Sequence, residues 1–264
     1  MIKMAKKLYR WEQKRLQKRT EEAKQKGNVS AALFLESEMN ALRDADCFFF
    51  YGGRRTPKAL LTVFFPDETR GEITAAEFLE TEEGLSLLYR KALRECKKID
   101  VECLHTVRNP ACGFSFDKIK GIRFSYDWSE YMLSAKMNVL AGTGEEDADK
   151  EQEQLTVRKK TAPEGDGTIR YSLEKGGQET ASCRILPMES GIGCYLFGLK
   201  TKEEFRRTGM ATRLLREIAK AYEGNEEAVM RLQVSSQNEP AERLYRKLGF
   251  LTEDEREYYK TEEC

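Results

Sequence analysis

The sequence is nearly without histidine. Its single histidine, His105, nearly excludes a Ser–His–Asp triad and a metal site built from several histidines. The residues around it, 101–107, alternate between apolar and polar as a strand does, which favours a structural role for His105 over a catalytic one. Any chemistry must therefore depend on other side chains.

Long apolar runs, paired cysteines and an excess of one charge are also missing. No stretch approaches the roughly 18–20 apolar residues that cross a bilayer, and charged residues from Lys3 onwards interrupt any signal-peptide core. The seven cysteines form no CxxC pair, which favours reduced thiols in a cytoplasmic protein over a disulfide framework or a zinc site. With 45 acidic and 45 basic side chains, no global field points to nucleic acid or to an anionic membrane.

The chain of 264 residues is long enough for one large domain or two of ordinary size. Residues 142–153 are acidic and have no apolar anchors, so they are predicted to link two domains at residues 1–141 and 154–264. The segment 1–27 is basic with a loose apolar stripe, which predicts a helix that docks one face. Nucleic-acid binding through this helix is the weaker alternative, because no groove-reading motif accompanies it.

The order of the expected elements predicts the fold class. In the first half, helices are expected at 31–43 and 83–97, and strands at 47–51, 59–65, 100–107, 121–126 and 130–139. In the second half, strands are expected at 155–159, 168–174, 179–187, 192–200 and 227–234, helices at 208–222 and 239–247, and an extended stretch at 250–260. Strands that alternate with helices in this way predict an α/β (α+β) protein with mixed β-sheets flanked by helices.

A basic turn stands between an expected strand and an expected helix in the second half. Arg206 and Arg207 are followed by Gly209 and Ala211, and an amphipathic helix begins there. The free N–H groups of a first helical turn, at the positive end of the helix dipole, form an anion site. Small residues let a phosphate approach the backbone closely, and arginine supplies donors suited to its oxygens. On its own, the turn predicts an anion site.

A second motif follows one helix and one strand later. Residues 238–250 have the sequence NEPAERLYRKLGF, which resembles, position for position, the Asn-x-x-Ala-x-x-Leu-Tyr-x-Lys-x-Gly-Phe signature of the GNAT N-acetyltransferases. The earlier Arg206-x-x-Gly209-x-Ala211 is similar to the pyrophosphate-binding signature of that superfamily, Gln/Arg-x-x-Gly-x-Gly/Ala. Because the two motifs occur in the order that the superfamily has, residues 154–264 are identified as a GNAT domain.

The resemblance implies an acetyl-CoA site. The strand end should pair with the pantetheine arm, the basic turn should cradle the diphosphate, and Asn238 should hydrogen-bond near the arm. The implied cofactor-binding residues are Leu199, Lys200, Thr201, Arg206, Arg207, Thr208, Gly209, Met210, Ala211, Thr212 and Asn238.

Tyr245 stands where many members of the superfamily have the general acid for the departing thiolate. A phenol, with a reference pKa of about 10, stays neutral at pH 7 and can protonate a thiolate whose reference pKa is about 8.5. The alternative for Tyr245 is an aromatic side chain that only fills the core. The general base is open, with Glu189 and Tyr195 as weak candidates, and direct transfer leaves Cys183 and Cys194 without a necessary catalytic role.

The resemblance implies an N-acetyltransferase that uses acetyl-CoA as co-substrate and transfers the acetyl group to a primary amine of a small molecule or peptide. The alternative is a pseudoenzyme or sensor module that binds CoA or an acyl-CoA. Neither nucleic acid nor a membrane is an expected partner, and the acceptor, the acyl length and the oligomeric state stay open.

Residues 47–139 repeat the order of elements of the second half, which suggests a tandem arrangement. An offset of 127 places Leu79 opposite Arg206, Glu82 opposite Gly209, and Gly84 opposite Ala211. Carboxylates at 80, 82 and 83 would then lie where a diphosphate binds and would repel it. The first half is therefore predicted to be a degenerate, non-binding GNAT-like copy; an unrelated α+β domain is the alternative.

Two further details bear on this copy. Asn109-Pro110-Ala111 echoes the start of the second motif, while Asp117 or Lys118 fills the position of the tyrosine. After the first strand of the second half, the segment 163–167 has no room for the pair of helices that walls the acceptor site in GNAT proteins. The first half is therefore expected to supply that wall.

Overall fold

The computed structural model describes residues 2–5, 9–28, 47–52, 57–65, 68–74, 82–112, 116–142, 155–161, 167–188, 193–222 and 224–263. The chain forms two compact units, each treated by itself below. Unit 1 comprises Met1–Glu130 together with Asp254–Cys264, and unit 2 comprises Tyr131–Glu253. No helix in the described part is both long and apolar enough to cross a membrane.

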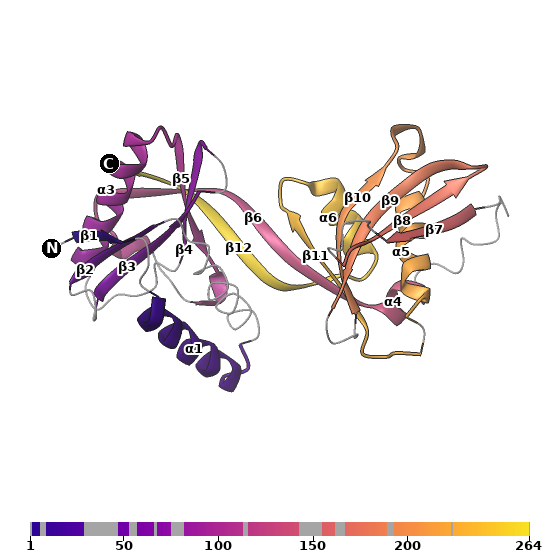
Figure 1. Cartoon of the computed structure of the whole chain (residues 1–264), viewed down its shortest axis with the longest axis horizontal. Helices are drawn as coiled ribbons and strands as arrows, with labels where there is room; N and C mark the ends of the chain where they lie inside the picture. Colours follow the sequence, from indigo (N-terminus) through magenta and orange to yellow (C-terminus); the bar gives the residue numbers. More distant parts are fainter. Residues whose placement is uncertain are drawn as a thin grey trace. The chain divides into compact units, whose positions relative to one another are not determined.

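The predicted fold class, a mixed α/β protein with its sheet flanked by helices, is confirmed (Figure 1). In unit 1 the strand order is β1-β2-β3-β4-β5-β12-β6, and β4 and β5 form its parallel pair. In unit 2 the order continues as β6-β11-β10-β9-β8-β7, and β10 and β11 form its parallel pair. Each unit therefore contains one strand–helix–parallel strand segment.

The elements of unit 1 are β1 (Ile2–Ala5), α1 (Tyr9–Gln25), β2 (Cys47–Gly52), β3 (Pro57–Phe64), β4 (Arg70–Thr74), α3 (Glu82–Lys98), β5 (Cys103–Arg108), two short 3₁₀ helices, η1 (Pro110–Cys112) and η2 (Phe116–Lys118), and the first part of β6 (Ile122–Lys136). Its core forms where α3 lays its apolar stripe, including Leu85, Leu88 and Tyr89, on the sheet. His105 is buried on β5, and its Nε2 lies 2.9 Å from Oδ2 of Asp127.

The elements of unit 2 are α4 (Met137–Gly142), β7 (Leu155–Thr161), β8 (Ile169–Lys175), β9 (Gln178–Pro187), β10 (Gly193–Thr201), η4 (Glu203–Phe205), α5 (Met210–Lys220), β11 (Val229–Ser235), α6 (Glu239–Lys247) and the start of β12 (Leu251–Glu263). In α5, Leu214, Leu215 and Ile218 recur at helical spacing and are fully buried. Each such side chain contributes about 1.5–3 kcal/mol on burial, so this stripe fixes α5 to the sheet.

Two local predictions were wrong. Residues 2–5 form a strand instead of the start of a helix, because they pair with β2 from Ile2↔Tyr51 to Ala5↔Phe48. A single strand, β6, covers residues 122–136, where two strands were expected. It ends at Lys136 and α4 begins at Met137, although the second expected strand extended to residue 139. Tertiary pairing overrode local propensity in both places.

The two units do not follow the predicted domain ranges. Their boundaries fall inside β6 and β12, so that Tyr131–Gly142 belongs to unit 2 and the last part of β12 belongs to unit 1. Of the predicted linker 142–153, only Gly142, the end of α4, lies among the described residues, and the helix expected at 31–43 lies outside them. Only residues 162–168 separate β7 from β8, which leaves no space for two helices.

Candidate cofactor and catalytic site

The sheet of unit 2 opens between β10 and β11. Their paired residues run from Gly193↔Val229 to Leu196↔Leu232, although β10 continues to Thr201 and β11 to Ser235. Beyond Leu196, β10 therefore pairs only with β9. The free edge of β10 can accept an extended, amide-bearing chain as an added strand, and it includes the predicted Leu199, Lys200 and Thr201.

A β-bulge interrupts this free edge. Phe197 pairs with Arg184 and Lys200 with Ser182, so Gly198 and Leu199 together stand opposite the single residue Cys183. Gly198 has φ of 61°, in the left-handed region that glycine adopts without steric cost. A bulge re-aims the backbone groups of a strand and is common beside active sites.

The basic turn ends in a helix terminus that no side chain caps. Gly209 is the N-cap residue of α5, with φ of 82°, and open space surrounds the position of a Cβ there. The backbone N–H groups from Arg207 to Thr212 find no acceptor among the described residues, and the first hydrogen bond of the helix runs from Arg213 N–H to Gly209 O at 2.9 Å. Six consecutive free donors at the positive end of a helix form an anion site.

A hydrogen bond within the turn stabilises its conformation. Thr208 Oγ1 donates to Phe205 O at 2.7 Å. Arg207 has φ of 64°, a conformation that costs a residue with a Cβ roughly 1–2 kcal/mol and that is concentrated at functional sites. The hydroxyl of Thr208 is therefore used within the turn, while its N–H stays free.

The side chains of the turn carry positive charge into solvent. Arg206 and Arg207 are exposed. The one ion pair here joins Arg206 Nη1 to Glu203 Oε1 at 4.0 Å, with both side chains well exposed, so it holds the guanidinium only weakly. Met210, Ala211 and Thr212 are half-buried as α5 enters the core. Backbone donors and exposed guanidinium groups are thus present at the same turn.

The segment after β11 turns into α6 at Asn238. The side chain of Asn238 accepts a hydrogen bond from Ala241 N–H at 3.4 Å, and Pro240 occupies the first turn, where its missing N–H costs nothing. Asn238 is thus an N-cap residue, which the sequence analysis did not foresee. Its exposed side-chain amide retains N–H donors without a partner among the described residues.

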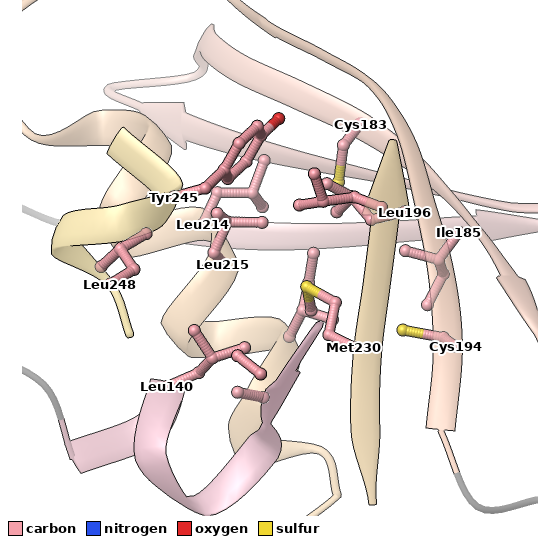
Figure 2. Packing of buried hydrophobic residues seen from close by; sticks show 14 of the residues in the cluster. Leu140, Cys183, Ile185, Cys194, Leu196, Leu214, Leu215, Met230, Tyr245 and Leu248 are labelled. Carbon is pink, nitrogen blue, oxygen red and sulfur yellow. The ribbon is translucent and has the colours of Figure 1, made fainter. Parts of the chain in front are cut away.

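Tyr245 projects from α6 into the core of unit 2 (Figure 2). It is only 7% exposed, and its ring packs edge-to-face on Phe250 with centroids 5.5 Å apart. Its hydroxyl has no hydrogen-bond partner within the described part of the chain, although the hydroxyl oxygen is not completely shielded from solvent. Figure 2 shows the hydroxyl pointing toward the strand that carries Cys183.

Burial sets the protonation of the groups around this hydroxyl. Desolvation, together with the neighbouring Cys183, raises the pKa of Tyr245 to about 12. Burial likewise raises the pKa of the Cys183 and Cys194 thiols to about 12. Tyr245 is therefore neutral at pH 7 and retains its hydroxyl proton.

Of the two weak candidates for a general base, Tyr195 lies among the described residues. Glu189 is outside the described residues. Tyr195 alternates with the buried Cys194 and Leu196, so it lies on the opposite face of the sheet from α5, and its hydroxyl donates to Gln233 Oε1 at 3.4 Å. Sequence reasoning missed Gln233 and the bulge at Gly198; a glycine within a strand was the available signal for the bulge.

Comparisons with known proteins bear on the fold. The family model described as FR47-like protein matches residues 184–259. A tandem GNAT protein from the clavulanic acid biosynthesis pathway is similar, with a TM-score of 0.55 and 14% identity over 89% of this chain and 87% of the other. A GCN5-related N-acetyltransferase from Sphaerobacter thermophilus has a TM-score of 0.55 and 12% identity over 87% of this chain and 85% of the other. No curated protein matches the sequence.

Proposed function

We propose that this chain, whose fold is that of the GCN5-related N-acetyltransferases, transfers an acetyl group from acetyl-CoA directly to a primary amine. One observation carries the proposal: unit 2 combines six N–H donors at the start of α5, the free edge of β10 and the hydroxyl of Tyr245, none of which has a hydrogen-bond partner among the described residues. The donors fit a diphosphate, the strand edge fits an arm with two amide groups, and the phenol fits a leaving sulfur.

Each residue has a defined task in this proposal. The amides of Arg207–Thr212 hold the diphosphate, with Arg206 and Arg207 adding charge. Leu199, Lys200 and Thr201 align the pantetheine arm by backbone pairing, and Asn238 donates to it. The amine nitrogen bonds to the thioester carbonyl carbon, the C–S bond breaks, and Tyr245 donates a proton to the sulfur.

The reaction needs no covalent acyl-enzyme. Cys183 and Cys194 are buried and neutral, so neither is a nucleophile. Water or a carboxylate takes the proton of the amine and returns Tyr245 to its neutral form. The acceptor belongs to a small molecule or peptide, and the free thiols of the described cysteines suit the reducing cytoplasm.

We further propose that unit 1 is a degenerate copy that binds no acetyl-CoA. Its β4–α3–β5 segment has the topology of β10–α5–β11. The tandem GNAT protein of similar fold supports the same arrangement of two copies in one chain.

A thermal-shift titration tests the cofactor site. Stabilisation by CoA and by acetyl-CoA should follow RT ln(1 + [L]/Kd), which at 100 Kd is about 2.7 kcal/mol. Release of free thiol from acetyl-CoA across a panel of amines then tests transfer. No shift with millimolar CoA would contradict the cofactor site, whereas binding without thiol release from any amine would support the alternative of a CoA-binding pseudoenzyme.

A further inference from the structure

The bulge in β10 gives Cys183 a particular position. Gly198 and Leu199 both stand opposite Cys183 on the neighbouring strand, at the level where the sheet opens. The Cys183 side chain is 2% exposed and belongs to the same core cluster as Tyr245. Figure 2 shows Tyr245 and Cys183 within this cluster, and Cys183 also lies opposite the bulge near the start of the free β10 edge.

Buried apolar side chains of one core cluster accompany Tyr245. Leu196, Leu214 and Cys183 belong to the same core cluster as Tyr245, and each is at most 2% exposed. Protein cores pack at nearly crystalline density, so a group that enters beside Tyr245 meets side chains instead of solvent. Among these residues, Cys183 has the smallest side chain.

We propose that Cys183 forms the floor of the acyl pocket and limits the transferred group to acetyl. This rests on the proposed function, because it requires the thioester to lie at the end of the β10 edge beside Tyr245. A pocket that fits an acyl group can discriminate one methylene by roughly 10- to 200-fold. A longer chain would have to displace the backbone around the bulge or the buried thiol.

The chemistry of Cys183 fits a packing role. Burial raises the pKa of its thiol to about 12, so the thiolate needed for acyl transfer to sulfur is absent near pH 7. A buried neutral thiol behaves as a small apolar group. The size of the Cys183 side chain, and not the reactivity of its thiol, then limits the acyl group.

Calorimetric titration tests this without knowledge of the acceptor. The ligands are CoA, acetyl-CoA, propionyl-CoA and butyryl-CoA, and the quantity compared is each Kd relative to that of CoA. The unsubstituted protein should bind propionyl-CoA at least about 10-fold more weakly than acetyl-CoA. Cys183→Ala should reduce this ratio to about 3-fold or less, and Cys183→Leu should weaken acetyl-CoA about 10-fold while leaving CoA unchanged.

Cys194→Ala is the matched control. Cys194 is equally buried in the same cluster, but it lies opposite Met230 near the start of β10, away from Tyr245 (Figure 2). This variant should keep the ratio of the unsubstituted protein, as should Cys183→Ser, which preserves side-chain size. A shift of the ratio in Cys194→Ala equal to that in Cys183→Ala would overturn the proposal.

The outcomes distinguish a wrong assignment of the acyl floor from a wrong assignment of the cofactor site. If CoA binds and every acyl-CoA binds equally in the unsubstituted protein and in Cys183→Ala, the acyl floor is wrong while the cofactor site stands. If CoA itself does not bind, the proposed function fails. A ratio that changes only in Cys183→Ala and Cys183→Leu supports the floor.

Discussion

The segments β4–α3–β5 and β10–α5–β11 share one topology, yet they end differently. In unit 1, β4 extends only one residue, Thr74, beyond its last pair with β5, Ile73↔Thr106; residues 75–81 lie outside the described part. In unit 2, β10 extends five residues beyond its last pair with β11. The free edge in unit 2 is therefore the part of β10 that continues beyond its pairs with β11.

The segments that follow the second strand also differ. Asn109, after β5, is fully buried, and its Nδ2 donates to Asp254 Oδ1 at 2.6 Å and to Glu255 O at 3.1 Å. Asn238, after β11, is exposed and caps a nine-residue helix. The same residue type therefore ties strands together in unit 1 and starts the helix that carries Tyr245 in unit 2.

Each unit has a buried tyrosine on a helix. Thr106 Oγ1 donates to the hydroxyl of Tyr89 on α3 at 3.1 Å, and Thr106 Oγ1 also lies 2.8 Å from Thr261 Oγ1. Tyr245 on α6 has no such partner in the described residues. A satisfied hydroxyl stabilises a core, whereas an unsatisfied one retains a donor for a ligand. This contrast supports the proposal of a cofactor site in unit 2.

The largest effect is expected from Gly209→Glu, which gives unit 2 the carboxylate that the sequence of unit 1 has at this point. A carboxylate beside the free N–H groups should weaken CoA binding by about 100-fold or more, roughly 3 kcal/mol, through repulsion of the diphosphate. Calorimetric titration with CoA measures this.

Gly177→Glu is the control for that substitution. Gly177 has φ of 83° and open space around its Cβ position, as Gly209 does, but it lies in the turn between β8 and β9. Both variants carry the same backbone strain, so only Gly209→Glu should lose CoA. Normal CoA affinity in Gly209→Glu would contradict both the anion site and the explanation of the degenerate copy.

Tyr245→Phe should lower kcat for acetyl transfer about 100-fold while the Kd for CoA stays unchanged, because only the proton donor is removed. Tyr89→Phe is its counterpart in unit 1: it should cost about 1 kcal/mol of unfolding free energy, through loss of a buried hydrogen bond, and leave kcat intact. Thiol-release kinetics and urea unfolding measure the two effects. Equal kcat in Tyr245→Phe and the parent would reduce Tyr245 to a packing residue.

The smallest effects on the proposed site are expected from the two asparagines. Asn109→Ala should lower the unfolding free energy by about 2–3 kcal/mol, since it leaves the buried Asp254 short of a donor, and should not change CoA affinity. Asn238→Ala should cost about 1 kcal/mol for the lost cap and also weaken CoA binding several-fold. Urea unfolding measures the loss of stability, and calorimetry measures the affinity for CoA. A larger loss of CoA affinity in Asn109→Ala than in Asn238→Ala would refute the assignment of the site to unit 2.

Much of this site could be predicted from the sequence because its parts are local. The helix expected at 239–247 is confirmed as α6, and the strand and helix expected at 227–234 and 208–222 correspond to β11 and α5 within a few residues. Helical periodicity and a glycine after the last turn act within one or two turns of chain. The role of Tyr245 stays a prediction, because it rests on the motif and not on a bound ligand.

The sequence by itself determined which residues could bind an anion or donate a proton, since these properties belong to side chains and to the first turn of a helix. Tertiary structure decided the rest. The end of β12 joined unit 1 although it follows α6 in the chain, and the bulge placed Gly198 and Leu199 opposite Cys183. Strand pairing joins residues far apart in sequence, so its register, its bulges and the point where two strands separate depend on partners that no local pattern specifies.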